Sequence, residues 1–192
     1  MSKNVIHIYG ASGSGTTTLA KYIHNNMGYF FMDTDDYFWL PTNPPYTEKR
    51  KIQERIQLMK EDIERHDKIV ISGSLANWGN ELIPFFSFVI RLVTDTDIRI
   101  ARLKEREKRK FGSRIEKGGD MYQHHLEFIE WAAGYDDGGT NMRSKAQHDE
   151  WQKLLKCKQV VLNGNDDLEY NWRQIKNYLT SSSSTADCEY PL

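Results

Sequence analysis

A glycine-rich turn between an apolar run and a helical pattern constrains this chain more than any other feature. Residues 5–19 read Val-Ile-His-Ile-Tyr-Gly-Ala-Ser-Gly-Ser-Gly-Thr-Thr-Thr-Leu. Gly10 and Gly15 have the spacing of the phosphate-binding motif G-x-x-x-x-G-K-[ST], and Thr17 occupies its Ser/Thr position. The lysine position of the motif holds Thr16 instead. The turn therefore predicts a phosphate-binding loop that lacks its usual cation.

The loop supplies the candidate nucleotide-binding residues. Glycines permit positive φ and bring backbone N–H groups close to a phosphate, and the helix that follows adds the positive end of its dipole. The Thr17 hydroxyl is the expected Mg²⁺ ligand, and ATP or GTP is the expected nucleotide. A plain turn between strand and helix is the alternative interpretation. The candidates are Gly10, Ala11, Ser12, Gly13, Ser14, Gly15, Thr16, Thr17 and Thr18.

Threonine at position 16 affects the expected chemistry more than the expected binding. The motif lysine reaches the β and γ phosphates and offsets charge in the transition state of phosphoryl transfer. Removing a positioned group of this kind costs several kcal/mol in typical enzymes. Either another cation fills the gap or the protein binds nucleotide with little turnover. Lys21, Lys3 and an arginine of the basic segment 99–117 are the candidates, and the arginine is favoured.

Strand-like and helix-like segments alternate along the chain, which is typical of a parallel sheet covered by helices. The expected strands span residues 5–9, 29–32, 68–72, 88–93 and 159–162. The expected helices span residues 16–27, 48–66 (capped by Thr47), 96–110, 120–133, 141–155 and 168–179. These elements predict a single α/β domain over residues 1–180. Residues 110–142 form an excursion with the character of a small lid, and residues 181–192 are expected to be a flexible tail.

Composition excludes several classes of protein. The net charge of −1 gives no overall electrostatic case for nucleic acid or a membrane as partner. No apolar stretch approaches the ~20 residues that cross a bilayer, and no signal peptide is expected before the first strand. Cys157 and Cys188 are far apart and lack metal-site spacing, which suits a reducing compartment. We therefore expect a cytoplasmic protein.

Three aspartates, Asp33, Asp35 and Asp36, follow the second expected strand. Ligands of open parallel sheets lie beyond the carboxyl ends of the strands, so these side chains are expected to face the phosphate loop. Asp33 or Asp35 is the expected catalytic base for a substrate hydroxyl, or holds Mg²⁺ through water. The sequence does not separate the two. Asp36 is a candidate substrate contact, and an acidic turn capped by Asp36 is the alternative.

The third expected strand ends in Ser72-Gly73-Ser74, where many phosphate-loop proteins place an acidic partner of Mg²⁺. Small residues leave room for a substrate near the backbone. Ser74 is therefore a candidate hydrogen-bond donor to the substrate. Trp78 is a candidate wall of a pocket for a ring-bearing acceptor, with ordinary core packing as the alternative.

Residues 99–117 carry nine Lys and Arg against three Glu. On a helix, Arg99, Arg102, Arg106 and Arg109 lie along one face, which suits a lid that closes over phosphates and excludes water. A solvated surface helix is the alternative, and an RNA partner is the least favoured interpretation. Arg143 opens a later helix. The catalytic candidates of this group are Arg102, Arg106 and Arg143.

Together these motifs resemble the small phosphate-loop kinases, which include the adenylate, shikimate and nucleoside kinase groups. The stretches Asp-Thr-Asp-Asp-Tyr-Phe-Trp and Trp-Ala-Ala-Gly-Tyr-Asp are similar to a bacterial group of adenylate-kinase-like proteins. The resemblance implies a P-loop NTPase fold with a five-stranded parallel sheet of order 2-3-1-4-5. It also implies ATP on the loop, Mg²⁺ at Thr17 and lid arginines around the phosphates. The stretch 35–38 resembles the segment that supplies the base in nucleoside kinases.

Two functions remain open from the sequence. The first is an ATP-dependent phosphotransferase of the nucleoside, nucleotide or small-metabolite kinase type, which phosphorylates a hydroxyl or phosphate acceptor. Its partners would be a nucleotide and a small-molecule acceptor. The second is a nucleotide-binding protein with weak or no turnover that serves as a sensor or regulatory partner. Thr16 favours the second function, whereas Asp35 and the arginines favour the first.

Overall fold

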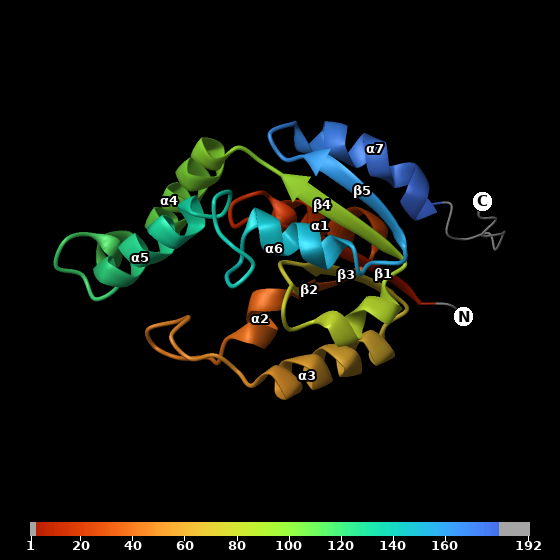
Figure 1. Ribbon diagram of the computed structural model, residues 1–192, viewed down its shortest axis with the longest axis horizontal. Coiled ribbons are helices and arrows are strands. Elements are labelled where there is room, and N and C mark those ends of the chain that lie inside the picture. The colour runs from red at the N-terminus through yellow and green to blue at the C-terminus, as the bar shows by residue number, and fades with distance from the viewer. Residues whose placement is uncertain (1–2, 181–192) are drawn as a thin grey trace.

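Five parallel strands form the centre of the molecule (Figure 1). The structure is a computed structural model that describes residues 3–180, so the expected tail and Cys188 lie outside the described residues. The strands lie in the order β2-β3-β1-β4-β5, which confirms the predicted sheet of a P-loop NTPase fold. They are β1 (Asn4–Gly10), β2 (Phe30–Asp33), β3 (Lys68–Ser72), β4 (Phe88–Val93) and β5 (Lys158–Asn163).

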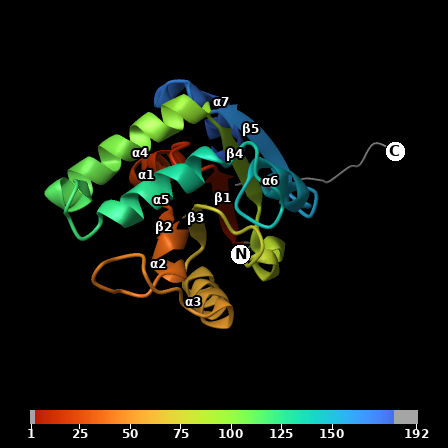
Figure 2. The ribbon, with the colours of Figure 1, turned by 60° about the vertical axis from the view of Figure 1, so that its left-hand side comes forward.

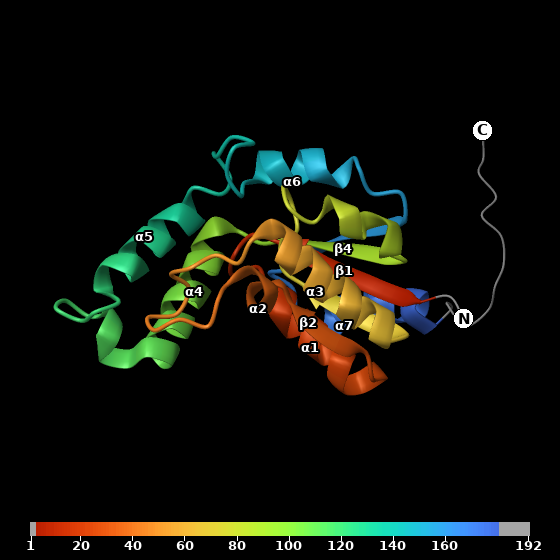
Figure 3. The ribbon, with the colours of Figure 1, turned by 90° about the horizontal axis from the view of Figure 1, so that it is seen from below.

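Helices cover both faces of the sheet (Figures 1 and 3). On one face, Ile23 of α1 and Ile175 of α7 pack against β1, β3 and β4. On the other, Met59 of α3 and Trp151 of α6 share a second apolar core with the 3-10 helix η1. Burial on both faces explains the nearly continuous apolar runs of the central strands. The helices are α1 (Thr16–Met27), α2 (Thr34–Phe38), α3 (Ile52–Arg65), η1 (Asn80–Phe85), α4 (Thr96–Phe111), η2 (Gly112–Ile115), α5 (Tyr122–Ala133), α6 (Lys145–Gln152) and α7 (Leu168–Thr180).

Helices α4 and α5 pack side by side and project away from the sheet, joined by η2 (Figure 2). Phe111, Ile115 and Met121 form a small apolar cluster at the far end of this projection. Tyr46, from the loop between α2 and α3, packs against the same cluster. The projection occupies most of the segment expected to be a lid, and its movement stays a prediction. No helix within residues 3–180 combines the length and the apolar character that spanning a membrane requires.

The sequence reasoning placed some helix ends wrongly. Helix α3 begins at Ile52, because the predicted cap Thr47 instead donates to the Pro44 carbonyl within the preceding loop. Residues 34–38 form α2, a short helix that was not predicted. The Asp33 carboxylate caps it by accepting a hydrogen bond from the Asp35 amide at 3.1 Å. Residues 34–38 are thus a helix capped by Asp33, and the alternative interpretation of an acidic turn capped by Asp36 is wrong.

Candidate functional site

The glycine-rich loop presents a row of free backbone amides. Gly15 takes a left-handed conformation with φ of 100° and forms the N-cap of α1 without a side-chain cap. The first intrahelical bond runs from the Leu19 amide to the Gly15 carbonyl at 3.0 Å. The amides of residues 15–18 therefore have no hydrogen-bond partner within the described part of the chain. Such a row at the positive end of a helix dipole is an anion-binding site.

Close packing beneath the loop explains why residue 13 is a glycine. Gly13 has φ of 83°, and a Cβ atom there would lie 2.6 Å from the carbonyl oxygen of Arg99. Any larger residue would push the loop off the start of α4. The Thr94 hydroxyl donates to the Ser14 carbonyl at 3.1 Å and holds the loop from the end of β4. The loop is thus fixed by its neighbours before any ligand binds.

Arg99 is a buried support for the loop rather than one of a row of lid arginines. Its side chain is 0% exposed, and its Nη1 donates to the Ser12 carbonyl at 3.4 Å and to the Ala132 carbonyl at 3.1 Å. Its Nη2 forms an ion pair with Asp136 at 3.1 Å. Sequence reasoning missed this role, because the helical spacing that groups Arg99 with Arg102 does not show that α4 starts beneath the loop.

Side-chain oxygen atoms from α1, β2 and β3 lie close together at Thr17. Its Oγ1 lies 3.4 Å from Oδ2 of Asp33, to which it donates, and 3.2 Å from Oγ of Ser72. Ser72 was not among the predicted site residues. The signal was available, since Ser72 ends β3 beside β1 and so faces the loop that follows β1. A hydroxyl and a carboxylate are hard oxygen ligands of the kind that Mg²⁺ prefers.

The Asp33 carboxyl group is held in an unfavourable environment for its charge. Burial raises the pKa of Asp33 to about 6, and the neighbouring carboxylate of Asp35 adds to this effect. Hydrogen bonds from the Asp35 amide and the Thr17 hydroxyl oppose the rise. A nearby cation would relieve this cost, which is a second reason to expect a metal ion at Asp33.

Asp35 lies on the first turn of α2 with its side chain exposed, and Arg143 directly precedes the N-cap of α6. Burial lowers the pKa of the Arg143 guanidinium, and the Asp35 carboxylate opposes that change. Arg143 stacks on Trp131 at 5.4 Å and forms no ion pair within the described residues. Asp36 is exposed beside them, and its predicted substrate contact stays a prediction. Among the described residues no hydrogen bond or ion pair joins Asp35 to Arg143, so their shared catalytic role stays a prediction.

A pocket of about 430 Å³ opens next to the loop. Thr18 and Arg102 line it, together with Gly164 and Asn165 of the turn after β5. Arg102 reaches across to this turn and donates from Nη1 to the Gly164 carbonyl at 3.0 Å. The predicted arginine therefore lies where a base or ribose attached to a loop-bound phosphate chain would extend.

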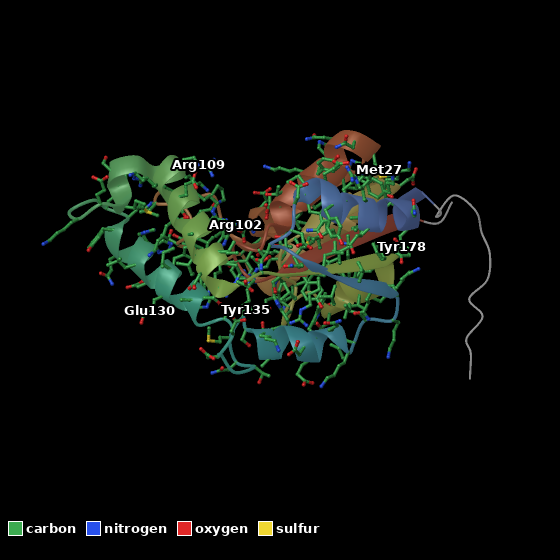
Figure 4. All side chains as sticks on the ribbon, turned by 90° about the horizontal axis from the view of Figure 1, so that it is seen from above. Met27, Arg102, Arg109, Glu130, Tyr135 and Tyr178 are labelled. Carbon is green, nitrogen blue, oxygen red and sulfur yellow. The ribbon has the colours of Figure 1, made fainter. Side chains whose placement is uncertain are left out.

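The other predicted arginine of α4 lies on the surface. The Arg106 side chain is 55% exposed, and its nearest acidic partner is Glu107 at 3.8 Å. It covers the Phe128 ring of α5 at 5.9 Å. Figure 4 shows Arg102 nearer the sheet and Arg109 toward the far end of α4. In this arrangement Arg106 makes no contact with the loop, so its catalytic role stays a prediction.

Ser74 and Trp78 both point into the protein interior. The Ser74 hydroxyl is buried and lies 2.8 Å from Nε2 of His148, while the Trp78 indole donates to the Ser74 carbonyl at 3.1 Å. Gly73 has φ of 110°, which breaks the strand alternation and turns Ser74 away from the face that Ser72 occupies. This geometry does not favour the predicted hydrogen bond from Ser74 to a substrate.

Neither lysine considered as a replacement for the missing cation reaches the loop. Lys3 donates to the carbonyls of Glu64 and His66 at 2.8 and 3.1 Å. Lys21 lies over the Phe31 ring at 5.6 Å. Arginine remains as the candidate.

Comparison with known proteins places this geometry in a family. The model of the family described as "AAA domain" matches residues 6–123, which include the loop and all of α4 and make up more than half of the chain. The chain belongs to the AAA domain family. This AAA domain protein is 39% identical over 184 residues to "Uncharacterized protein YqaC" of Bacillus subtilis (strain 168), across 95% of this chain and 100% of that protein.

Solved structures of kinases share the fold of this AAA domain protein. A shikimate kinase from Bacteroides thetaiotaomicron matches with a TM-score of 0.56 and 15% identity, over 92% of this chain and 98% of that one. A deoxyadenosine kinase from M. mycoides matches with a TM-score of 0.52 and 18% identity, over 92% and 99%. At these sequence identities the similarity shows a shared fold and nothing more. The AAA domain protein has the P-loop fold of the small kinases.

Proposed function

We propose that this AAA domain protein is an ATP-dependent phosphotransferase that acts on a small molecule. The observation that carries the proposal is the row of free amides at residues 15–18, which opens directly beside the 430 Å³ pocket. A nucleotide spans both features, with its phosphates on the amides and its base and ribose in the pocket. Arg102 and Asn165 contact the nucleotide there, which is ATP or GTP.

The oxygen cluster at Thr17 suits the Mg²⁺ that accompanies a nucleotide. Mg²⁺ is commonly held by one or two protein oxygens together with substrate phosphates and waters. Thr17 and Asp33 supply a hydroxyl and a carboxylate for this purpose, and Ser72 lies beside them. When bound, the ion neutralises charge on the phosphates. The assignment of Asp33 to this role leaves Asp35 as the catalytic base.

Asp35 accepts the proton of the acceptor group that attacks the γ-phosphoryl group. Its carboxylate is exposed at the same end of the sheet as the loop, on a helix fixed by the Asp33 cap. General-base catalysis of this kind contributes about 10²–10⁴-fold to a rate. In this proposal Arg143, whose guanidinium interacts electrostatically with Asp35, supplies the positive charge that the threonine at position 16 does not provide. A guanidinium serves here because it stays charged and binds phosphate through two parallel donors.

The projection of α4, η2 and α5 is the proposed lid. Closure would bring Arg106 toward the phosphates and exclude water, which suppresses wasteful hydrolysis. In the structure, the apolar cluster at its far end already contacts Tyr46 of the α2–α3 loop. Movement of the projection is therefore linked to the loop that leads from the base-bearing helix α2.

A second candidate function is nucleotide binding with little turnover, as in a sensor or a regulatory partner. Thr16 is the observation that favours it, because neither Lys3 nor Lys21 takes over the missing position. The same nucleotide site serves both functions. They differ in whether ATP is consumed when an acceptor is present.

Calorimetry with Mg·ATP and Mg·GTP, followed by a coupled assay of ADP or GDP release over a panel of hydroxylated metabolites, tests the proposal. We expect binding in the wild-type protein and nucleotide consumption with at least one acceptor. Gly13→Ala should abolish binding, because its Cβ would lie 2.6 Å from the Arg99 carbonyl. Gly134→Ala is the matched control, since its Cβ would make ordinary contacts at 3.7 Å and beyond. Binding without consumption supports the second function, and absence of binding contradicts both.

A further inference from the structure

The α5–α6 connection, residues 134–144, carries Arg143 and is closed at its base by Tyr135. Figure 4 shows Tyr135 where α5 ends. The Lys145 amide donates to the Tyr135 carbonyl at 2.8 Å. The Tyr135 hydroxyl lies 2.7 Å from Nδ1 of His148, near the start of α6. The backbone and the side chain of Tyr135 therefore each join one end of the connection to the other.

His148 is a fixed link between two hydroxyl groups. Its side chain is 0% exposed, and its Nε2 lies 2.8 Å from the hydroxyl of Ser74, which follows β3. Burial, and after it the cation of Arg143, lowers the pKa of His148 to about 3, so the imidazole is neutral at neutral pH. A neutral imidazole has one donor and one acceptor nitrogen, which pair with both hydroxyls at once. His148 thus holds its neighbours without carrying a proton.

The ring of Tyr135 joins the same connection to the nucleotide loop. The guanidinium carbon of Arg99 lies 5.1 Å from the centre of the Tyr135 ring. Arg99 also pairs with Asp136, the next residue of the connection, and donates to the Ser12 carbonyl of the loop. Tyr135 is therefore held between the buried support of the loop on one side and His148 on the other.

The backbone beside Arg143 is fixed to the start of α6. The Ser144 hydroxyl accepts a hydrogen bond from the Gln147 amide at 3.0 Å and donates to the Gly139 carbonyl at 2.8 Å. Arg143 directly precedes Ser144, so its backbone moves with the first turn of α6. The two hydrogen bonds of Tyr135 attach that turn to the end of α5. The place of Arg143 relative to the nucleotide loop therefore depends on Tyr135.

We propose that Tyr135 and His148 are positioning residues that hold Arg143 toward the phosphates bound on the nucleotide loop. This inference rests on the proposed function, in which Arg143 supplies the charge that Thr16 lacks. A lysine within the loop is placed by the loop itself, whereas an arginine on a separate connection needs its own support. Such support matters because a charge stabilises phosphoryl transfer only where it is already in place.

Trypsin tests the positioning without any ligand, because it cleaves the chain after Arg143 itself. Cleavage requires local opening of the backbone. We expect Tyr135→Phe to speed cleavage after Arg143 by about tenfold in the full chain, since one of the two closing hydrogen bonds is lost. Mass spectrometry of the fragments identifies the cleaved bond. Equal rates in the wild type and Tyr135→Phe overturn the inference.

Ser74→Ala is the matched control for this assay. It removes the other hydroxyl from the same imidazole but leaves both hydrogen bonds of Tyr135 in place. The rate of cleavage after Arg143 should therefore stay within about twofold of the wild type. A similar increase in Ser74→Ala and Tyr135→Phe shows a general loss of stability and counts against the inference.

Variants of His148 separate its two hydrogen bonds. Asparagine places an amide near the position of Nδ1, and glutamine places one near Nε2. We expect His148→Asn, which keeps a partner for Tyr135, to resemble the wild type in cleavage after Arg143. His148→Gln should resemble Tyr135→Phe. Equal behaviour of the two variants overturns the role of His148.

Calorimetry with Mg·ATP and Mg·ADP tests the consequence for phosphate binding. We expect Tyr135→Phe to weaken Mg·ATP by about fivefold or more and Mg·ADP by less than about twofold, because a misplaced Arg143 affects the additional phosphate most. In an Arg143→Met background, Tyr135→Phe should add no further loss, whereas additive losses overturn the inference. Absence of Mg·ATP binding in the wild type contradicts the proposed function, and the trypsin rates then still decide the role of Tyr135.

Discussion

The hydroxyl of Thr17 donates to the carboxylate of Asp33 across 3.4 Å and so joins the first turn of α1 to the end of β2. The same carboxylate accepts from the Asp35 amide at 3.1 Å and starts α2. One acidic group therefore connects the proposed metal site with the helix that carries the proposed base. Its protonation state is expected to affect both.

Asp33→Asn should flatten the dependence of stability on pH. The pKa of Asp33 is about 6 in the folded protein, against an ordinary 3.8. Between pH 4 and 6 the folded state keeps a proton that the unfolded chain releases, so the free energy of unfolding falls as pH rises through this window. The total effect is about 2–3 kcal/mol. Urea denaturation from pH 4 to 7.5 measures it, with the exposed Asp137→Asn as control, and equal slopes in both variants contradict the prediction.

Asp35→Asn should abolish phosphorylation of the acceptor while leaving nucleotide binding intact. An amide cannot accept the acceptor proton, so we expect kcat to fall by about 10²-fold or more. The affinity for Mg·ATP in calorimetry should stay within about twofold, because Asp35 does not line the nucleotide pocket. Asp36→Asn is the matched comparison and should change KM rather than kcat. Unchanged turnover in Asp35→Asn would remove this residue as the base.

Thr16→Lys should raise turnover if positive charge is simply missing from the loop. The lysine of the motif offsets charge on the β and γ phosphates, and a gain of about tenfold in kcat corresponds to about 1.4 kcal/mol. Thr16→Met is the control, since it adds bulk without charge. A loss of turnover in both variants shows that another group, of which Arg143 is the candidate, already occupies the space.

Arg99→Met should destabilise the protein strongly. The substitution leaves the Ser12 and Ala132 carbonyls without the Arg99 donor, and the Asp136 carboxylate keeps only the hydrogen bond from Thr96. Each buried acceptor left without a donor costs about 1–3 kcal/mol. Arg109→Met is the control, because Arg109 is 74% exposed and forms only a surface ion pair with Glu105, which contributes about 0–1 kcal/mol. Chemical denaturation of both variants measures the difference, and similar values would contradict the supporting role of Arg99.

Much of the fold was predictable from local pattern. The phosphate-binding loop and its flanking strand and helix depend on residues adjacent in sequence, so local pattern was enough to predict them. The order of the five strands followed from the resemblance. Helix ends were less predictable. Thr47 has the side chain of a helix cap, yet its hydroxyl donates to the Pro44 carbonyl within the preceding loop, and Lys49 pairs with Trp39 in an isolated antiparallel bridge.

The site was predictable where it follows strand ends and unpredictable where it depends on tertiary packing. Asp33 and Asp35 could be located because β2 ends there. Ser74 could not, because the positive φ of Gly73 reverses the side on which it lies. Arg55 precedes Met59 by four residues, and this spacing places both on the inner face of α3. The ring that stacks on the Arg55 guanidinium belongs to α2, and this contact was not predictable from the sequence.

Arg99 touches Thr94 at the root of α4, Ala132 at the end of α5 and Ser12 in the nucleotide loop. The start of α4 and the end of α5 are thus both held by Arg99, beneath the loop. A rigid-body rotation of α4 and α5 would displace the loop as well, because Arg99 contacts all three. We therefore expect any bending of the projection to occur in its outer half, beyond the contacts of Arg99, so that the loop keeps its geometry.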